Sequence, residues 1–193
     1  MRKLIVSNLI SVDGYAAGPG GDVMALPFDT TFSEYNLELM QSADILVSGA
    51  TTYRGFVSYW PSVADDPSQP EVERAISRRH RELQHLVVSD TLTPEETGPW
   101  GDHTTIVRRH EARAAIVEMK HGDGGALVTF GSTTVWNGLL AAGLVDELHL
   151  MVGAGVLAEG VPAFSAPPPS PLRLIGARQL GDSNIALLRY ALG

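Results

Sequence analysis

Residues 126–134 read Ala-Leu-Val-Thr-Phe-Gly-Ser-Thr-Thr, and this stretch says most about the fold. Ala126–Phe130 is a short apolar run that stops at a glycine, as a buried strand does. Helical spacing of apolar residues follows over Thr133–Ala142 and is closed by Gly143. A strand that turns directly into a helix is typical of α/β proteins.

Similar patterns precede and follow this unit. Apolar and β-branched runs predict strands over residues 4–10, 44–48, 86–89, 104–107 and 145–152, and helices are expected after Gly49 and over residues 30–41, 71–83 and 111–120. Residues 61–70 and 162–171 are rich in proline and are expected to be loops. Residues 172–180 and 185–192 are expected to form a C-terminal hairpin, because the Gly-Asp-Ser-Asn segment between them favours a turn.

The alternation of strands and helices predicts an α/β fold: a mostly parallel sheet with helices on both faces and an antiparallel hairpin at the C-terminal end. No repeat or linker divides the 193 residues, so we expect a single domain over residues 1–193. There is no cysteine, which excludes disulfide scaffolds, thiolate metal sites and cysteine nucleophiles.

The charge balance restricts the possible partners. The formal net charge is −8 and no basic run is present, which argues against binding to nucleic acid. No stretch approaches the roughly 20 apolar residues of a membrane span, and the N-terminal apolar run is too short for a signal peptide. We therefore expect a soluble, cytoplasmic protein.

Three predicted strand ends carry small polar residues. They are Gly49, Ala50, Thr51 and Thr52; Ser89, Asp90 and Thr91; and Gly131, Ser132, Thr133 and Thr134. Ligands of open α/β sheets bind at such ends, and a helix that starts there offers free amide hydrogens to a phosphate. Two helix starts in one sheet could hold a pyrophosphate from both sides. The alternative interpretation is that these residues only cap helices.

Two aspartates are candidates for catalysis. Asp13 follows the first strand and could hydrogen-bond a substrate ring or the nicotinamide ribose, although aspartate is also common in turns. Asp29 could orient or protonate a pteridine-like ring, or simply be the N-cap of the next helix. Tyr15, Tyr53 and Trp60 are candidate stacking surfaces, although aromatic side chains more often belong to the core.

Other motifs do not support a site. Gly18–Gly21 follows a strand but lacks the G-x-G-x-x-G spacing, and neither a P-loop nor a G-x-S-x-G elbow is present. The six histidines have no metal-ligand spacing, so no metal site is expected.

Several segments resemble dihydrofolate-reductase-like proteins. They are Lys3–Tyr15, Leu46–Tyr53, Leu86–Leu92, Phe130–Val135, Gly143–Leu148 and Gly155–Phe164, which together cover nearly the whole chain. The sequence is most similar to stand-alone proteins that resemble the reductase domain of the bifunctional riboflavin-biosynthesis enzyme. The resemblance implies a mixed sheet of about eight strands, a homodimer and an NADPH-dependent reductase. Residues 49–52, 89–91 and 131–134 would then bind the cofactor, and Asp13 would lie beside the substrate.

The sequence departs from this family at informative positions. Ala50 and Asp90 stand where the family usually has positive charge, so NADH is possible in place of NADPH, with Asp90 accepting the ribose 2′-hydroxyl. Arg54, Arg108 or Arg109 could restore that charge. Thr129 replaces the carboxylate of true riboflavin reductases, and riboflavin synthesis is therefore not expected.

Three hypotheses remain open at this stage. The first is hydride transfer from a nicotinamide to a small pterin- or pyrimidine-like heterocycle. The second is a non-catalytic dinucleotide- or ligand-binding protein that retains the fold. The third is an unrelated α/β scaffold whose helix starts only carry caps.

Overall fold

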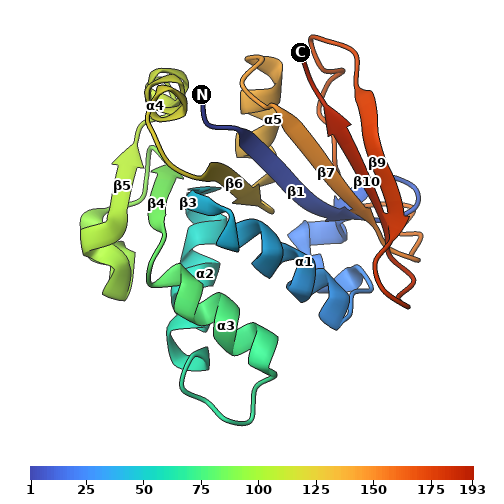
Figure 1. The fold of residues 1–193 in the computed structure, drawn as a ribbon, viewed down its shortest axis with the longest axis horizontal. Coiled ribbons are helices and arrows are strands. Elements are labelled where there is room, and N and C mark those ends of the chain that lie inside the picture. Colours follow the sequence, from blue (N-terminus) through green and yellow to red (C-terminus); the bar gives the residue numbers. More distant parts are fainter.

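An eight-stranded sheet runs through the computed structural model, which describes residues 1–193 (Figure 1). The strand order is β5-β4-β3-β6-β1-β7-β10-β9. These strands are β1 Leu4–Ile10, β3 Ala43–Gly49, β4 Gln84–Val88, β5 Thr104–Val107, β6 Ala126–Phe130, β7 Glu147–Val152, β9 Arg173–Gln179 and β10 Ala186–Ala191. Pairing is parallel from β5 to β7, and β10 is antiparallel to both β7 and β9. The predicted α/β class, mostly parallel sheet and C-terminal hairpin are confirmed.

Helices cover both faces of the sheet. They are α1 Thr30–Gln41, α2 Ala50–Val63, α3 Glu71–His80, α4 Ala112–His121 and α5 Thr133–Ala141, with short 3-10 segments at Pro19–Gly21, Val23–Ala25 and Pro94–His103. In Figure 1, α4 and α5 lie above the sheet and α1 to α3 lie below it. This division follows from right-handed crossovers, because connections toward β5 and connections back toward β7 must pass over opposite faces.

The two-sided covering explains the composition of the central strands. Every residue of β1 is buried. Leu4 and Val6 join the apolar cluster under α4 and α5, whereas Ile5 and Leu9 join the cluster under α1 and α3. A strand buried on both faces has apolar residues in succession rather than in alternation.

Asp146 and Glu147 are held in structural contacts at the start of β7. Asp146 accepts a hydrogen bond from the Leu4 amide (2.7 Å) and forms an ion pair with the Lys120 ammonium (2.6 Å). Burial opposes ionisation of Glu147, but hydrogen bonds from Lys3 and His149 outweigh it and lower the pKa of its carboxyl to about 2. These contacts give both carboxylates a structural role.

Locally the structure differs from the expected loops at Pro61 and Pro162, and it contains two features for which no prediction was made. Pro61, expected in a loop, lies in the last turn of α2, where the Trp60 and Pro61 carbonyls accept hydrogen bonds from Ser77 and Arg81. Those two side chains satisfy carbonyls at the end of the helix, which would otherwise lack partners. A second small sheet pairs β2 Tyr15–Ala17 with β8 Val161–Pro162, and the segment Pro94–His103 forms 3-10 turns. None of these has a clear periodic signal in the sequence.

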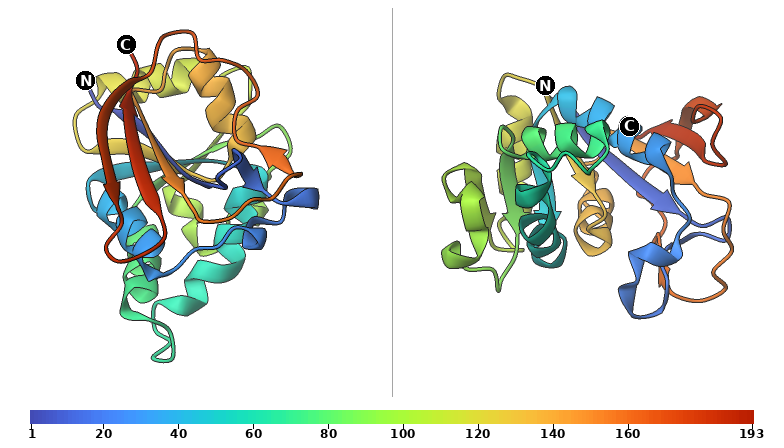
Figure 2. Two further views of the ribbon diagram at one scale, coloured as in Figure 1. Left: turned by 90° about the vertical axis from the view of Figure 1, so that its right-hand side faces the viewer. Right: turned by 90° about the horizontal axis from the view of Figure 1, so that it is seen from below.

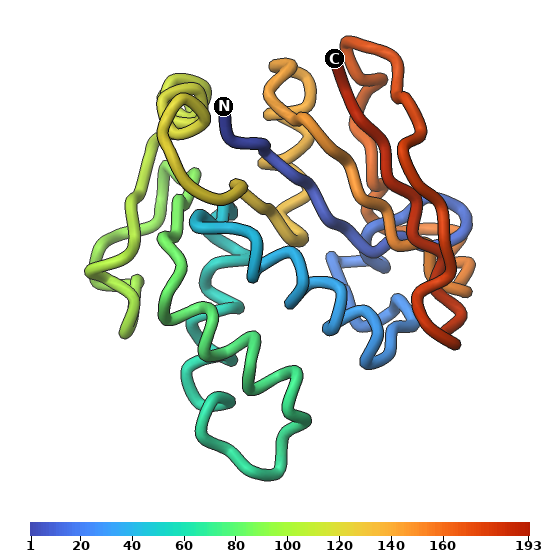
Figure 3. The backbone as a smooth tube through the Cα atoms, viewed as in Figure 1, coloured from blue at the N-terminus to red at the C-terminus, as the bar shows by residue number.

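The C-terminal hairpin forms one edge of the sheet, and it faces the viewer in the left view of Figure 2. The backbone trace shows both termini at the same end of the molecule, because β1 begins there and β10 returns to it (Figure 3). None of the helices combines the length and the apolar character needed to cross a bilayer.

Candidate functional site

The N-termini of α2 and α5 lie side by side at the carboxyl ends of β3 and β6. The Gly49 amide donates a hydrogen bond to the Ser132 hydroxyl over 3.1 Å, which links the two helix starts directly. A Cβ added at Gly131 would lie 3.7 Å from the Thr52 Cγ2 atom. Each helix start carries a partial positive charge and free amide hydrogens. Their convergence forms a place where a pyrophosphate could be held by both helices.

The turn before α5 has an unusual backbone conformation. Gly131 (φ 56°) and Ser132 (φ 48°) are consecutive residues in the left-handed region. This conformation is ordinary for glycine but costs a serine about 1 kcal/mol or more. Ser132 also makes no side-chain hydrogen bond to the first turn of α5, since its hydroxyl is bonded to Gly49 instead. Ser132 is thus the N-cap residue of α5 by position, but its side chain does not cap the helix.

The third predicted strand end lies next to Gly49 in the sheet. Ser89 is buried, and its hydroxyl accepts hydrogen bonds from the amides of Thr91 (3.0 Å) and Leu92 (2.9 Å). Its role in the structure is therefore to hold the turn. Asp90 and Thr91 are exposed. The strands β4, β3 and β6 are neighbours in the sheet. Their carboxyl ends, at Ser89, Gly49 and Gly131, therefore form a continuous row.

Asp13 is held by the loop that follows β7. Its two carboxylate oxygens accept hydrogen bonds from the amides of Leu157 (3.1 Å) and Ala158 (2.7 Å). Hydrogen bonding from the Ser11 hydroxyl and from these amides outweighs desolvation and lowers the pKa of Asp13. The group is thus an ionised acceptor at neutral pH. The sequence alone did not reveal these amide partners, because no side-chain pattern marks them.

Asp29 is the N-cap of α1. One of its carboxylate oxygens accepts hydrogen bonds from the Thr31 amide (3.0 Å) and the Thr31 hydroxyl (2.6 Å). The segment before it packs on the loop after β7, since a Cβ at Gly155 would lie 2.8 Å from Pro27. The structure therefore assembles residues 13, 27 and 153–158 into one wall, beyond the end of β1.

The three candidate stacking residues have different environments. Tyr53 is fully buried, and its hydroxyl is bonded to the Thr97 carbonyl and the Thr104 hydroxyl. It belongs to the core, so its assignment as a stacking surface is wrong. The Tyr15 hydroxyl donates to the Ala158 carbonyl. Trp60 stacks on His80.

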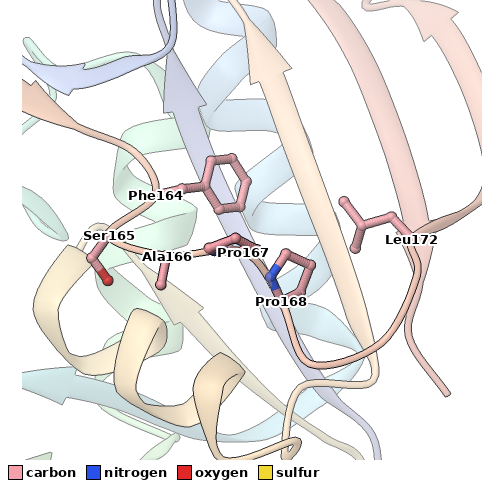
Figure 4. Close-up of a pocket in the computed structure, with 6 residues that line it drawn as sticks. All are labelled: Phe164, Ser165, Ala166, Pro167, Pro168 and Leu172. Carbon is pink, nitrogen blue, oxygen red and sulfur yellow. The ribbon is translucent and has the colours of Figure 1, made fainter.

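One hollow in the structure lies away from these strand ends. It has a volume of about 410 Å³ and is lined by Phe164, Ser165, Ala166, Pro167, Pro168 and Leu172 (Figure 4). Its lining comes from the proline-rich segment that leads into β9 and offers one side-chain hydroxyl and no charge. It contains none of the candidate residues. No group of histidine, aspartate and glutamate side chains is arranged to bind a metal.

Comparison with known proteins assigns the family. The family model of the RibD C-terminal domain matches residues 2–186. The chain belongs to the RibD C-terminal domain family. The hypothesis of an unrelated α/β scaffold is therefore wrong.

Solved structures share the fold at low sequence identity. A protein from Shewanella sp. PV-4, named after riboflavin biosynthesis, is 23% identical with a TM-score of 0.66, over 100% of this chain and 99% of that one. A pyrimidine reductase-like protein from Corynebacterium diphtheriae is 15% identical (TM-score 0.63; 100% and 92% covered). Dihydrofolate reductase from Enterococcus faecalis, in complex with NADP(H), is 12% identical (TM-score 0.63; 99% and 96% covered). No curated protein matches the sequence significantly.

Proposed function

We propose that this member of the RibD C-terminal domain family is a nicotinamide-dependent reductase that acts on a small pterin- or pyrimidine-like heterocycle. The observation that carries the proposal is the contact between the starts of α2 and α5 through Gly49 and Ser132. The names of two relatives with the same fold, a pyrimidine reductase-like protein and a dihydrofolate reductase bound to NADP(H), support it.

The residues present fit a dinucleotide. Gly49 and Gly131 have no side chain, so a phosphate can approach the backbone between the helices. Thr51, Thr52, Thr133 and Thr134 supply hydroxyl donors in the first turns of α2 and α5. Asp90 and Thr91 then lie on the adenosine side. When bound, the nicotinamide supplies the hydride, and the protein contributes position and polarity.

The two aspartates have limited roles in this proposal. Asp13, as an ionised acceptor, orients a ring N–H of the substrate or the nicotinamide ribose. Asp29 serves as an N-cap, and we keep its part in proton transfer only as a secondary proposal. Since its lowered pKa keeps Asp13 ionised at neutral pH, Asp13 accepts hydrogen bonds and does not donate a proton to the substrate.

A non-catalytic binding protein is the second candidate. It is favoured by Thr129, which stands two residues before Gly131 without a carboxylate, and by the engagement of Asp13 with backbone amides. The second candidate binds a dinucleotide or another ligand at this site and differs from the reductase in having no turnover.

Fluorescence titration of the purified protein with NADPH and NADH tests the proposal. We expect at least one of them to bind with a dissociation constant in the micromolar range. Absence of binding by both would contradict the proposal. Oxidation of the bound coenzyme by a panel of pterins, pyrimidines and quinones separates the reductase from the non-catalytic protein. The variants Asp13→Asn and Asp29→Asn in the same assay test the roles of these two residues.

We also propose that the protein forms a homodimer, as the family resemblance implies. The outer edge of β9 has no strand partner within the chain, and Leu174 on that strand is exposed. Unpaired edges of this kind readily pair with another chain. Light scattering coupled to gel filtration should give twice the monomer mass of 20.6 kDa, and a monomer at micromolar concentration would refute the proposal.

A further inference from the structure

Two segments form the wall beyond the end of β1: residues 11–32, which follow β1, and residues 153–166, which follow β7. Backbone hydrogen bonds join them, since the Val12 amide donates to the Gly155 carbonyl over 2.8 Å. In the right view of Figure 2 they run close together as blue and orange chain. Because the proposed function places Asp13 beside the substrate, this wall is the surface that a substrate would contact.

The wall carries charge of one sign. Its two segments contain four acidic residues and no lysine, arginine or histidine. The acidic residues are Asp13, Asp22, Asp29 and Glu159. The lack of basic residues extends further, because no lysine or arginine occurs over residues 4–53 or residues 121–172. The wall therefore repels anions.

Arginines outside the wall do not compensate for this charge. Arg54 on α2 is bonded to Glu96 over 2.7 Å. Arg178 on β9 lies over the Tyr35 ring and 3.8 Å from Glu38. β9 is also three strand spacings from β1, or about 14 Å. The arginines that follow β5 are four spacings from β1 on the other side, or about 19 Å.

The helix that begins in the wall offers no place for an anion either. α1 starts at Thr30, and the Asp29 carboxylate already accepts a hydrogen bond from the Thr31 amide over 3.0 Å. An anionic group that approached this helix start would meet the carboxylate before the free amides. In contrast, the starts of α2 and α5 have no carboxylate cap, and the proposed function assigns them to the coenzyme.

Large apolar side chains are exposed on the same wall. Five of the eight exposed large hydrophobic residues of the chain lie in its two segments, namely Val12, Val23, Met24, Phe28 and Val156. Met24 and Val156 are each 70% exposed. The Tyr15 side chain also lies against the wall, since its hydroxyl donates to the Ala158 carbonyl. Exposed apolar side chains that gather in one region are typical of a binding surface.

We propose that the substrate is an uncharged or cationic heterocycle with an apolar substituent, and that the protein discriminates against phosphorylated and carboxylated analogues. A ring N–H of the substrate donates to Asp13, and the substituent packs against the exposed apolar side chains. A phosphate or carboxylate on the same ring would find no cation and no free helix start. This inference rests on the proposed function, because it names the substrate class of the same site.

Two pterins provide a direct test, because 6-methylpterin and 6-carboxypterin share one ring and differ only in the charge and polarity of the substituent. Calorimetric titration of the wild type at low ionic strength should show at least about tenfold tighter binding of 6-methylpterin. The ratio should narrow at high ionic strength, because salt screens the repulsion between the wall and the carboxylate.

A cation placed on the wall should remove much of the discrimination. Val156→Lys should strengthen binding of 6-carboxypterin several-fold and narrow the ratio, since an ammonium then faces the carboxylate. Val156 is highly exposed, so the fold should tolerate lysine there. Ala114→Lys is the matched control: it adds the same charge at an exposed position of α4, away from the wall, and should leave both affinities unchanged.

Coenzyme titration of the same preparation separates this inference from the proposed function. If a nicotinamide coenzyme binds but the two pterins bind equally, or neither binds, the inference is overturned and the proposed function stands. Tighter binding of 6-carboxypterin by the wild type would overturn it as well. An equal gain of 6-carboxypterin affinity in Val156→Lys and Ala114→Lys would show that net charge, and not the wall, sets the preference. If neither coenzyme binds, the proposed function fails and the inference fails with it.

Discussion

Replacing Thr52 by glutamate should weaken binding of both nicotinamide coenzymes about 100-fold without weakening the fold. Thr52 is the third residue of α2 and lies close to Gly131 at the start of α5. A carboxylate in the first turn of a helix interacts favourably with the helix dipole, by about 0.3–1 kcal/mol. The same charge would occupy the space of the pyrophosphate and repel it.

The expected loss of affinity is large. At a separation of about 5–6 Å and an effective dielectric constant of about 20, two unit charges repel by about 3 kcal/mol, which corresponds to about 100-fold in affinity. Thermal unfolding of the same variant should show a midpoint equal to or above that of the wild type. Loss of binding would therefore not be explained by loss of structure.

Thr52→Gln separates charge from size. The glutamine side chain has nearly the shape of glutamate and no charge, so this variant should keep most of its affinity. If Thr52→Glu binds NADPH or NADH as the wild type does, the coenzyme does not lie between α2 and α5. If both variants lose binding equally, bulk rather than charge at position 52 is responsible.

The second large effect is a loss of stability in mild acid, caused by two buried histidines. His80 and His85 are exposed by only 2% and 1%, and their rings stack on the Trp100 ring with centroid distances of 5.1 and 4.8 Å. The Nδ1 atom of each has no hydrogen-bond partner. Burial lowers the pKa of His80 well below its usual value, with a further contribution from His85. Burial lowers the pKa of His85 as well.

The sign of the effect follows from proton binding. Below about pH 6.5 the unfolded chain protonates both histidines, whereas the folded protein keeps them neutral. The free energy of unfolding therefore falls as the pH falls, by about 1.4 kcal/mol per pH unit for each histidine. Above pH 6.5 both states are neutral and the contribution disappears. Between pH 7.5 and 5.5 the two residues together should cost at most about 2–3 kcal/mol, with His80, whose pKa is lowered further, contributing the larger part.

Urea unfolding at several pH values between 7.5 and 5.5 measures this loss. His80→Phe retains an aromatic ring between Trp60 and Trp100 and should remove about half of the pH dependence. In this variant the free energy of unfolding should still fall as the pH falls, because His85 remains. His149, whose pKa is also lowered by burial, should add a smaller contribution. His110→Gln, at an exposed histidine, is the control and should behave as the wild type. A stability that does not change over this pH range would contradict the prediction.

Much of the fold could be predicted from local patterns. The strand over residues 4–10 and the helix over residues 30–41 agree with the structure, because an apolar run and a 3.6-residue period are properties of adjacent residues. Prediction failed where the signal depended on contacts with distant segments. Pro61 is helical because side chains of α3 and the turn after it satisfy carbonyls at the end of α2. Val161–Pro162 is a strand only because Tyr15–Ala17 lies opposite.

The candidate site shows the same division. The sequence by itself determined that Gly49, Ser89 and Gly131 follow strands and that two of them precede helices. It could not determine that the Gly49 amide bonds to Ser132, 83 residues away, or that Asp13 holds amides 144 and 145 residues away. It also left Arg54, Arg108 and Arg109 equivalent. Only the tertiary contacts distinguish them, because Arg54 pairs with Glu96 and Arg109 with Asp90, whereas the Arg108 guanidinium donates to the Ser89 carbonyl. Backbone conformation is set mainly by neighbours in sequence, whereas the partner of a polar side chain is set by which elements the core brings together.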